Sequence, residues 1–188
     1  MGKVIALINA TPDGFYDSQF VTADAEFHEY VHGLLANTQT VAFGRNTFEL
    51  FQGIWPPILE NENAPGSQVK MAKALHDMDK IVFSTTLSNT TWSNSTIVKK
   101  IDTADINHFK QSSSKNLLTI GSPGIVGALT RLNLADEYFF SIQPTIAGHG
   151  NVRMFDATKL DARQPLKFIG LKQLKSGVVI LHYEKVKN

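Results

Sequence analysis

The segment from Leu117 to Phe155 constrains the fold of this chain more than any other. It reads LLTIGSPGIVGALTRLNLADEYFFSIQPTIAGHGNVRMF and predicts a buried strand at 117–120, a glycine turn at 121–124, a helix at 125–132 and a second strand at 137–142. A strand that leads through glycines into a helix exposes backbone N–H groups at the positive end of the helix dipole, which can hold phosphate. The spacing G-x-x-G-x-x-G differs from the dinucleotide fingerprint G-x-G-x-x-G, so support for a phosphate site at this turn must come from the rest of the chain.

Apolar strands alternate with helices through the preceding chain as well. Strands are predicted at 3–8, 40–44, 80–84 and 96–99, and helices at 45–51, 69–76, 106–111 and from an N-cap at Thr22 to Asn37. The segment 52–67 is predicted to be a loop because it is rich in proline and glycine. Alternating segments at 166–174 and 178–186 flank Gly177 and predict an antiparallel hairpin. The fold class is therefore α/β, with helices on both faces of a mostly parallel sheet of about eight strands.

Composition limits the classes of function. The 188 residues predict a single domain spanning 1–188. The net charge is only +1 and no basic run exceeds two residues, so neither a nucleic-acid nor a membrane partner is expected. The absence of cysteine excludes disulfides and thiolate chemistry. No apolar run is long enough for a transmembrane helix, and the first apolar run is too short for a signal peptide, so a cytoplasmic protein is expected.

Several loops that follow the predicted parallel strands carry residues suited to bind phosphate or ribose. Such loops gather at the carboxyl ends of the strands, where α/β proteins bind ligands. After the second strand, Gly44, Arg45, Asn46 and Thr47 open a helix and offer N–H groups, a guanidinium and a hydroxyl; an ordinary helix start with a surface arginine is the alternative. Ser84, Thr85 and Thr86 end the third strand with hydroxyls, and a capped strand end is the alternative there.

The sequence H-E-x-x-H at His28, Glu29 and His32 matches the zinc-protease spacing. The apolar face of its predicted helix centres near Phe27, Val31 and Leu34, which puts both histidines on the polar flank. No third ligand follows at the expected spacing. The pattern therefore favours two solvated or cleft-edge histidines and no metal site, and a zinc hydrolase is the lesser alternative.

The order of these motifs resembles the dihydrofolate reductase-like superfamily, and within it the branch that contains the reductase domain of bacterial riboflavin biosynthesis. The resemblance covers nearly the whole chain. The motifs that carry it are Pro-Asp-Gly-Phe at 12–15, Phe-Gly-Arg-Asn-Thr-Phe-Glu at 43–49, Val-Phe-Ser-Thr-Thr-Leu at 82–87 and Ile-Gly-Ser-Pro-Gly-Ile-Val at 120–126.

The resemblance implies a nicotinamide cofactor, which is NADPH or, as the alternative, NADH. It implies that Gly44, Arg45 and Thr47 hold part of the phosphates, and that Ser84 and Thr85 face the adenosine ribose. The pyrophosphate is expected against the late turn, formed by Gly121, Ser122, Pro123, Gly124, Ile125 and Val126. Relatives often carry arginine at the position of Thr85, so its absence leaves the preference for NADPH over NADH open.

The substrate side is less constrained by the resemblance. Classical reductases use one carboxylate on the first helix to orient the pteridine, so Asp24 and Glu26 are the catalytic candidates, with ordinary first-turn carboxylates as the alternative. Phe27, Tyr30 and Trp55 are the substrate-binding candidates, although Trp55 could equally cap the core. The predicted function is NAD(P)H-dependent reduction of a small pterin-, pyrimidine- or flavin-precursor-like heterocycle by a homodimer. The alternative is a non-catalytic module that binds a nucleotide or folate-like ligand.

Overall fold

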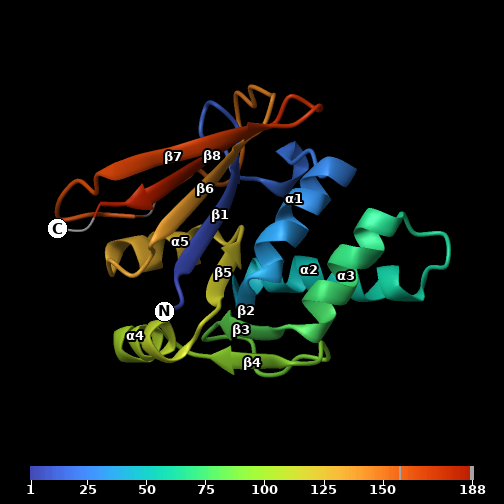
Figure 1. Ribbon diagram of the computed structural model, residues 1–188, viewed down its shortest axis with the longest axis horizontal. Helices are drawn as coiled ribbons and strands as arrows, with labels where there is room; N and C mark the ends of the chain where they lie inside the picture. Colours follow the sequence, from blue (N-terminus) through green and yellow to red (C-terminus); the bar gives the residue numbers. More distant parts are fainter. Residues whose placement is uncertain (157, 187–188) are drawn as a thin grey trace.

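A single sheet connects the whole molecule, with its strands in the order β4-β3-β2-β5-β1-β6-β8-β7 (Figure 1). The computed structural model describes residues 1–156 and 158–186. The first six strands in this order pair in parallel, and β8 runs antiparallel to both neighbours, which confirms the predicted sheet and its closing hairpin. The strands are β1 (Val4–Ala10), β2 (Thr38–Gly44), β3 (Asp79–Phe83), β4 (Ser95–Val98), β5 (Asn116–Ile120), β6 (Glu137–Ile142), β7 (Leu166–Gln173) and β8 (Val179–Lys185).

Helices cover both faces of the sheet, as predicted (Figure 1). One face packs against α1 (Ala25–Ala36), α2 (Arg45–Glu60) and α3 (Gly66–Asp77), and the other against α4 (Thr103–Ser112) and α5 (Pro123–Arg131). Side chains alternate along β1, so that Ile5 and Leu7 enter the first core and Val4, Ala6 and Ile8 enter the second. A short 3₁₀ helix, η1 (Ser18–Phe20), follows β1. None of the helices in the described residues has the length and apolar character needed to cross a membrane.

The predicted loop at 52–67 is wrong. α2 continues through Pro56 and Pro57 to Glu60, and α3 begins at Gly66. The two prolines remove two backbone donors, but burial of an apolar face outweighs that loss. The face has helical spacing along the segment and packs on the core through Phe48, Phe51, Trp55 and Ile58.

The N-cap of α1 is Asp24 rather than the predicted Thr22. Asp24 Oδ1 accepts a hydrogen bond from Phe27 N at 2.8 Å. Thr22 lies in the preceding loop, where its backbone N–H donates to Gln143 Oε1 at 2.8 Å. A bond to a distant residue therefore fixes the conformation of Thr22, and the helix starts at the next suitable side chain.

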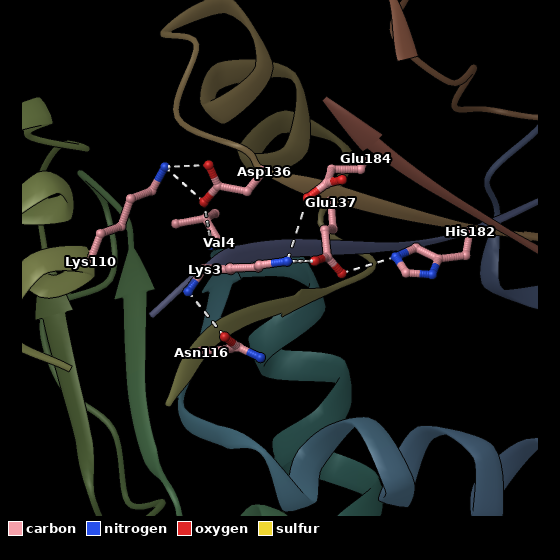
Figure 2. Close-up of polar contacts among 8 residues, drawn as sticks. All are labelled: Lys3, Val4, Lys110, Asn116, Asp136, Glu137, His182 and Glu184. Carbon is pink, nitrogen blue, oxygen red and sulfur yellow. Dashed lines mark hydrogen bonds and ion pairs between the residues drawn. The ribbon is translucent and has the colours of Figure 1, made fainter. Parts of the chain in front are cut away.

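Charged side chains gather at the amino ends of β1 and β6 (Figure 2). Glu137 bonds Lys3 and lies 2.9 Å from His182 Nε2, while Lys3 Nζ lies 3.6 Å from Glu184. Beside this group, Asp136 pairs with Lys110 of α4 at 2.8 Å and accepts a bond from Val4 N. These contacts join β1, β6, β8 and α4, and they lie at the end of the strands opposite to the carboxyl ends.

Lys80 of β3 is a buried lysine with a structural role. Its side chain is almost fully enclosed, and Nζ donates to the carbonyls of Leu75, His76 and Met78 at the end of α3. The ammonium also lies 4.8 Å from the ring centre of Trp92. Burial lowers the pKa of Lys80 to about 8, and the charges of Asp79 and Asp77 partly oppose this shift.

This lysine predicts a pH dependence of stability. Between about pH 8 and 10.5 the unfolded chain keeps the Lys80 proton and the folded chain releases it, so the unfolding free energy rises with pH. Relative to Lys80→Met, the wild type should gain on the order of 3 kcal/mol over this interval. Urea unfolding of both proteins at several pH values measures the difference. A difference that does not change with pH would contradict the assignment.

Candidate functional site

Two turns at the carboxyl ends of neighbouring strands are tied together by reciprocal hydrogen bonds. Gly44 N, at the last residue of β2, donates to Ser122 Oγ at 3.0 Å, and Ser122 N, after β5, donates to Thr47 Oγ1 at 3.1 Å. Gly121 and Ser122 both adopt left-handed backbone conformations, with φ of 66° and 56°. A non-glycine residue held in this region is a form of local strain that clusters at functional sites. The two turns therefore form one rigid unit.

This unit places the N-termini of α2 and α5 side by side. Gly44 is the N-cap of α2 and Ser122 that of α5, and in the described residues no side chain caps either helix. The first-turn amides of α2 and the Gly124 amide of α5 thus remain available at two positive dipole ends, whereas Pro123 has no N–H and Ile125 N donates to Ser122 O at 2.9 Å. Arg45 is exposed at the start of α2 and adds a cation. The structure brings the two predicted phosphate sites together, and their use by a cofactor stays a prediction.

A cavity of about 560 Å³ opens beside these turns. Asn9 of β1 and Ile120 of β5 line its sheet side, and α1 and α2 line its walls. Of the predicted cofactor residues, it is lined by Asn46, Thr47, Gly121, Ser122 and Pro123. Of the predicted substrate residues, Phe27 and Trp55 line it. Tyr30 instead packs against Phe139 of β6, with ring centres 6.4 Å apart.

Other predicted cofactor residues lie outside this cavity. Gly124 lines a neighbouring cavity of about 250 Å³, whereas Ile125 and Val126 pack into the core beneath α5. Ser84 Oγ accepts bonds from the backbone N–H groups of Thr86 and Leu87 at 3.2 and 2.9 Å, and so caps the end of β3. Thr85 is exposed. Ribose binding by Ser84 and Thr85 stays a prediction.

The two candidate catalytic carboxylates make structural contacts. Asp24 caps α1, and Glu26 Oε2 accepts a bond from Lys175 N at 2.8 Å. Glu26 Oε1 also lies 3.8 Å from Lys172 Nζ, so this side chain holds the β7–β8 hairpin against α1. Neither residue lines the cavity. A catalytic role for either one stays a prediction, and each contact described here is complete without a substrate.

His28 lies at the cavity, as the cleft-edge alternative predicted, but it is buried and does not lie on a polar flank of α1. Its side chain is only 7% exposed, lines the cavity and meets the Trp55 ring edge-on at 5.6 Å. The buried face of α1 is wider than expected because α3 packs on it and Trp55 of α2 meets His28, in addition to the sheet. Burial lowers the pKa of His28 below its usual 6.5, and the charge of Asp24 partly opposes this.

The zinc-site alternative gains no support from the structure. His28 lines the main cavity, whereas His32, one turn later, lines a different cavity beside Asp77 and Lys115. Within residues 1–156 and 158–186, no group of three histidine, aspartate or glutamate side chains is placed to hold a metal ion. The two histidines of the H-E-x-x-H pattern therefore line separate cavities.

Two aspartates near the cavity were missed as functional candidates. Asp13 accepts bonds from Gly148 N at 2.7 Å and Ala147 N at 3.1 Å, and Asp17 accepts from Asn151 N at 3.0 Å. Hydrogen bonds from Thr11 and these backbone groups lower the pKa of Asp13 to about 2. The aspartates fix the loop at 147–152 over the cavity. The Pro-Asp-Gly-Phe motif marked the turn that contains Asp13, but the loop that these aspartates bind lies far along the chain.

The fold and this site define a dihydrofolate reductase-like α/β protein: a mostly parallel sheet with a C-terminal antiparallel hairpin, helices on both faces and a cavity at the strand carboxyl ends. Residues 4–180 match the model of the RibD C-terminal domain family, and the chain belongs to this family.

Three known proteins show the extent of the likeness. The uncharacterized protein YyaP of Bacillus subtilis is 23% identical over 96% of this chain and 94% of its own. A Thermotoga maritima structure, named diaminohydroxyphosphoribosylaminopyrimidine deaminase/5-amino-6-(5-phosphoribosylamino)uracil reductase, has a TM-score of 0.68 at 15% identity, covering 98% of this chain and 57% of that one. Dihydrofolate reductase from Enterococcus faecalis, solved with NADP(H), has a TM-score of 0.63 at 10% identity, covering 99% and 98%. The two structures establish the shared fold.

The bond between the two turns predicts a loss of stability when it is removed. Thr47→Val deletes the acceptor of Ser122 N–H while keeping the shape of the side chain, so unfolding free energy should fall by about 1–2 kcal/mol. Thr96→Val is the control, because Thr96 is an exposed strand residue. Denaturant unfolding measures both variants. Equal stability of Thr47→Val and the wild type would show that the turns do not depend on this bond.

Proposed function

We propose that the protein is an NAD(P)H-dependent reductase of a small heterocyclic compound, reducing a C=N group to CH–NH. The observation that carries the proposal is the pair of uncapped helix N-termini, tied together by hydrogen bonds and opening on a single cavity. Two dipole ends and an arginine suit a ligand with a pyrophosphate group and a polar ribose. Membership of the RibD C-terminal domain family and the NADP(H)-bound neighbour support this interpretation.

In this proposal the chain's own residues bind and orient the cofactor and exclude water from the site. First-turn amides of α2 and the Gly124 amide of α5 hold the phosphates, and Arg45 adds a charge-assisted bond to them. The αL turn at Gly121 and Ser122 lets the backbone approach the cofactor closely. Ser84 and Thr85 lie at the end of the adjacent β3 and are proposed to face the adenosine ribose.

The apolar part of the cavity is the proposed substrate half. Phe27, Phe51 and Trp55 surround it, so a planar ring can stack there without water. When bound, the cofactor supplies a hydride from its nicotinamide ring. The protein's part is to hold the acceptor carbon near that ring and to keep the site dry, since positioning accounts for much of the rate enhancement in such reactions.

Cofactor binding and turnover test the proposal directly. Isothermal titration should show NADPH or NADH binding, and absorbance at 340 nm should fall when a suitable pterin, deazaflavin or pyrimidine is added. Absence of binding at millimolar cofactor would refute the proposal. Binding of both ligands without oxidation of the cofactor would favour a non-catalytic nucleotide- or folate-binding module instead.

Arg45 provides a second, sharper test. Arg45→Gln removes the cation beside the first turn of α2, so the affinity for NADPH should fall by about tenfold, the size of one charge-assisted hydrogen bond. Neither arginine lines the cavity, and Arg163→Gln is the matched control because Arg163 is also exposed but belongs to neither of the two turns. Titration calorimetry at fixed ionic strength compares the two. An equal loss in both variants would show a general charge effect rather than a contact.

A further inference from the structure

The walls of the main cavity contain a concentration of unpartnered polar atoms. In the described residues, nine buried side-chain nitrogen or oxygen atoms lack a hydrogen-bond partner. Four of the nine belong to residues that line this cavity: Asn9 Oδ1, Tyr16 OH, His28 Nδ1 and Trp55 Nε1. Buried polar groups in folded proteins are nearly always paired, so four exceptions at one cavity indicate groups kept for a ligand.

The chemistry of these groups describes the ligand that would satisfy them. Asn9 Oδ1 is an acceptor, whereas Trp55 Nε1 is only a donor. Tyr16 OH and the His28 imidazole can act in either direction, depending on the proton that each carries. The ligand must therefore offer both a donor and an acceptor. Phe27, Val31, Phe51 and Ile54 add apolar surface around these groups, so the body of the ligand is expected to be flat and apolar.

The described side chains that line the cavity offer no lysine or arginine to an anionic substrate. Among the described residues that line it, none is lysine or arginine, and Asp17 is the one charged side chain. The Asp17 carboxylate already accepts bonds from Asn151 N, Asn151 Nδ2 and Val152 N. Arg131 and Arg153 line the neighbouring smaller cavity instead, where Arg153 stacks on Phe15 at 4.5 Å. A phosphate or carboxylate in the substrate half would thus be buried without a cation.

We infer that the substrate is an uncharged planar heterocycle, with a ring N–H and a ring carbonyl or imine nitrogen, that carries neither a phosphate nor a carboxylate. Trp55 and Asn9 bind its two edges, and His28 completes the pairing. The inference rests on the proposed function and narrows it. It also separates this chain from the Thermotoga protein, whose name contains a phosphoribosylamino substrate.

Two matched pairs of compounds test the charge preference. The first pair is 6-methyl-7,8-dihydropterin and 7,8-dihydrofolate, whose tail carries two carboxylates. The second pair is 5-amino-6-(ribosylamino)uracil and its 5-phosphate. Calorimetric titration of the purified protein, with and without saturating NADP⁺, should show at least tenfold tighter binding of an uncharged member than of its charged partner. Equal or tighter binding of the charged member in both pairs would overturn the inference, as would failure of both uncharged members to bind.

Two tryptophan variants test the recognition residues. Trp55→Phe removes the buried, unpartnered N–H of a residue that lines the cavity while keeping an aromatic ring, and should weaken binding of the uncharged member by about tenfold. Trp92→Phe is the control, because Trp92 Nε1 is also buried and unpartnered but lies outside the cavity. Thermal melts establish that both variants fold. Unchanged affinity in Trp55→Phe, or the same loss in both variants, would contradict the assignment of Trp55.

The readouts separate this inference from the proposed function. Preferential binding of an uncharged ring without cofactor oxidation supports the inference and refutes the reductase. Oxidation of NADPH with the phosphorylated or carboxylated member as the better substrate supports the reductase and refutes the inference.

Discussion

The hydrogen bonds between the turns after β2 and β5 are the constraint on which the site depends. Gly44 N and Ser122 N each donate to a hydroxyl of the opposite turn, so α2 and α5 start at fixed positions beside one another. Ser122 is held in a left-handed conformation in the process. These bonds use the hydroxyls of Thr47 and Ser122, and they leave the first-turn amides of α2 and the Gly124 amide of α5 for a ligand.

Much of this architecture could be predicted from the sequence. Short apolar runs ended by glycine or hydroxyl residues predicted the sheet, and the turns at 44–47 and 121–124 do meet on one rim. The prolines at 56 and 57 led to the wrong prediction of a loop. Burial of Trp55 favours the helix by more than the low helix propensity of proline disfavours it. His28 was misplaced for a related reason: periodicity on one helix does not reveal how many neighbours will pack on it.

The parts of the site that could not be predicted depend on contacts between distant segments. Asp13 and Asp17 fix a loop more than 130 positions away, and no local pattern reports that pairing. The two ends of the sheet also have different roles. Ion pairs close the amino end around Glu137, while the carboxyl end keeps a cavity whose unpartnered groups are uncharged or weakly basic. Ion pairs thus stabilise the amino end of the sheet, and the groups proposed to bind a ligand lie at the carboxyl end.

A crystal structure of the protein soaked with NADPH tests the central claim most directly. The account predicts that the pyrophosphate lies between the first turns of α2 and α5, beside Arg45 and Ser122, with the nicotinamide ring extending into the cavity towards Trp55. A cofactor bound at any other place, or a soak at millimolar NADPH that leaves both turns without ligand, would contradict it.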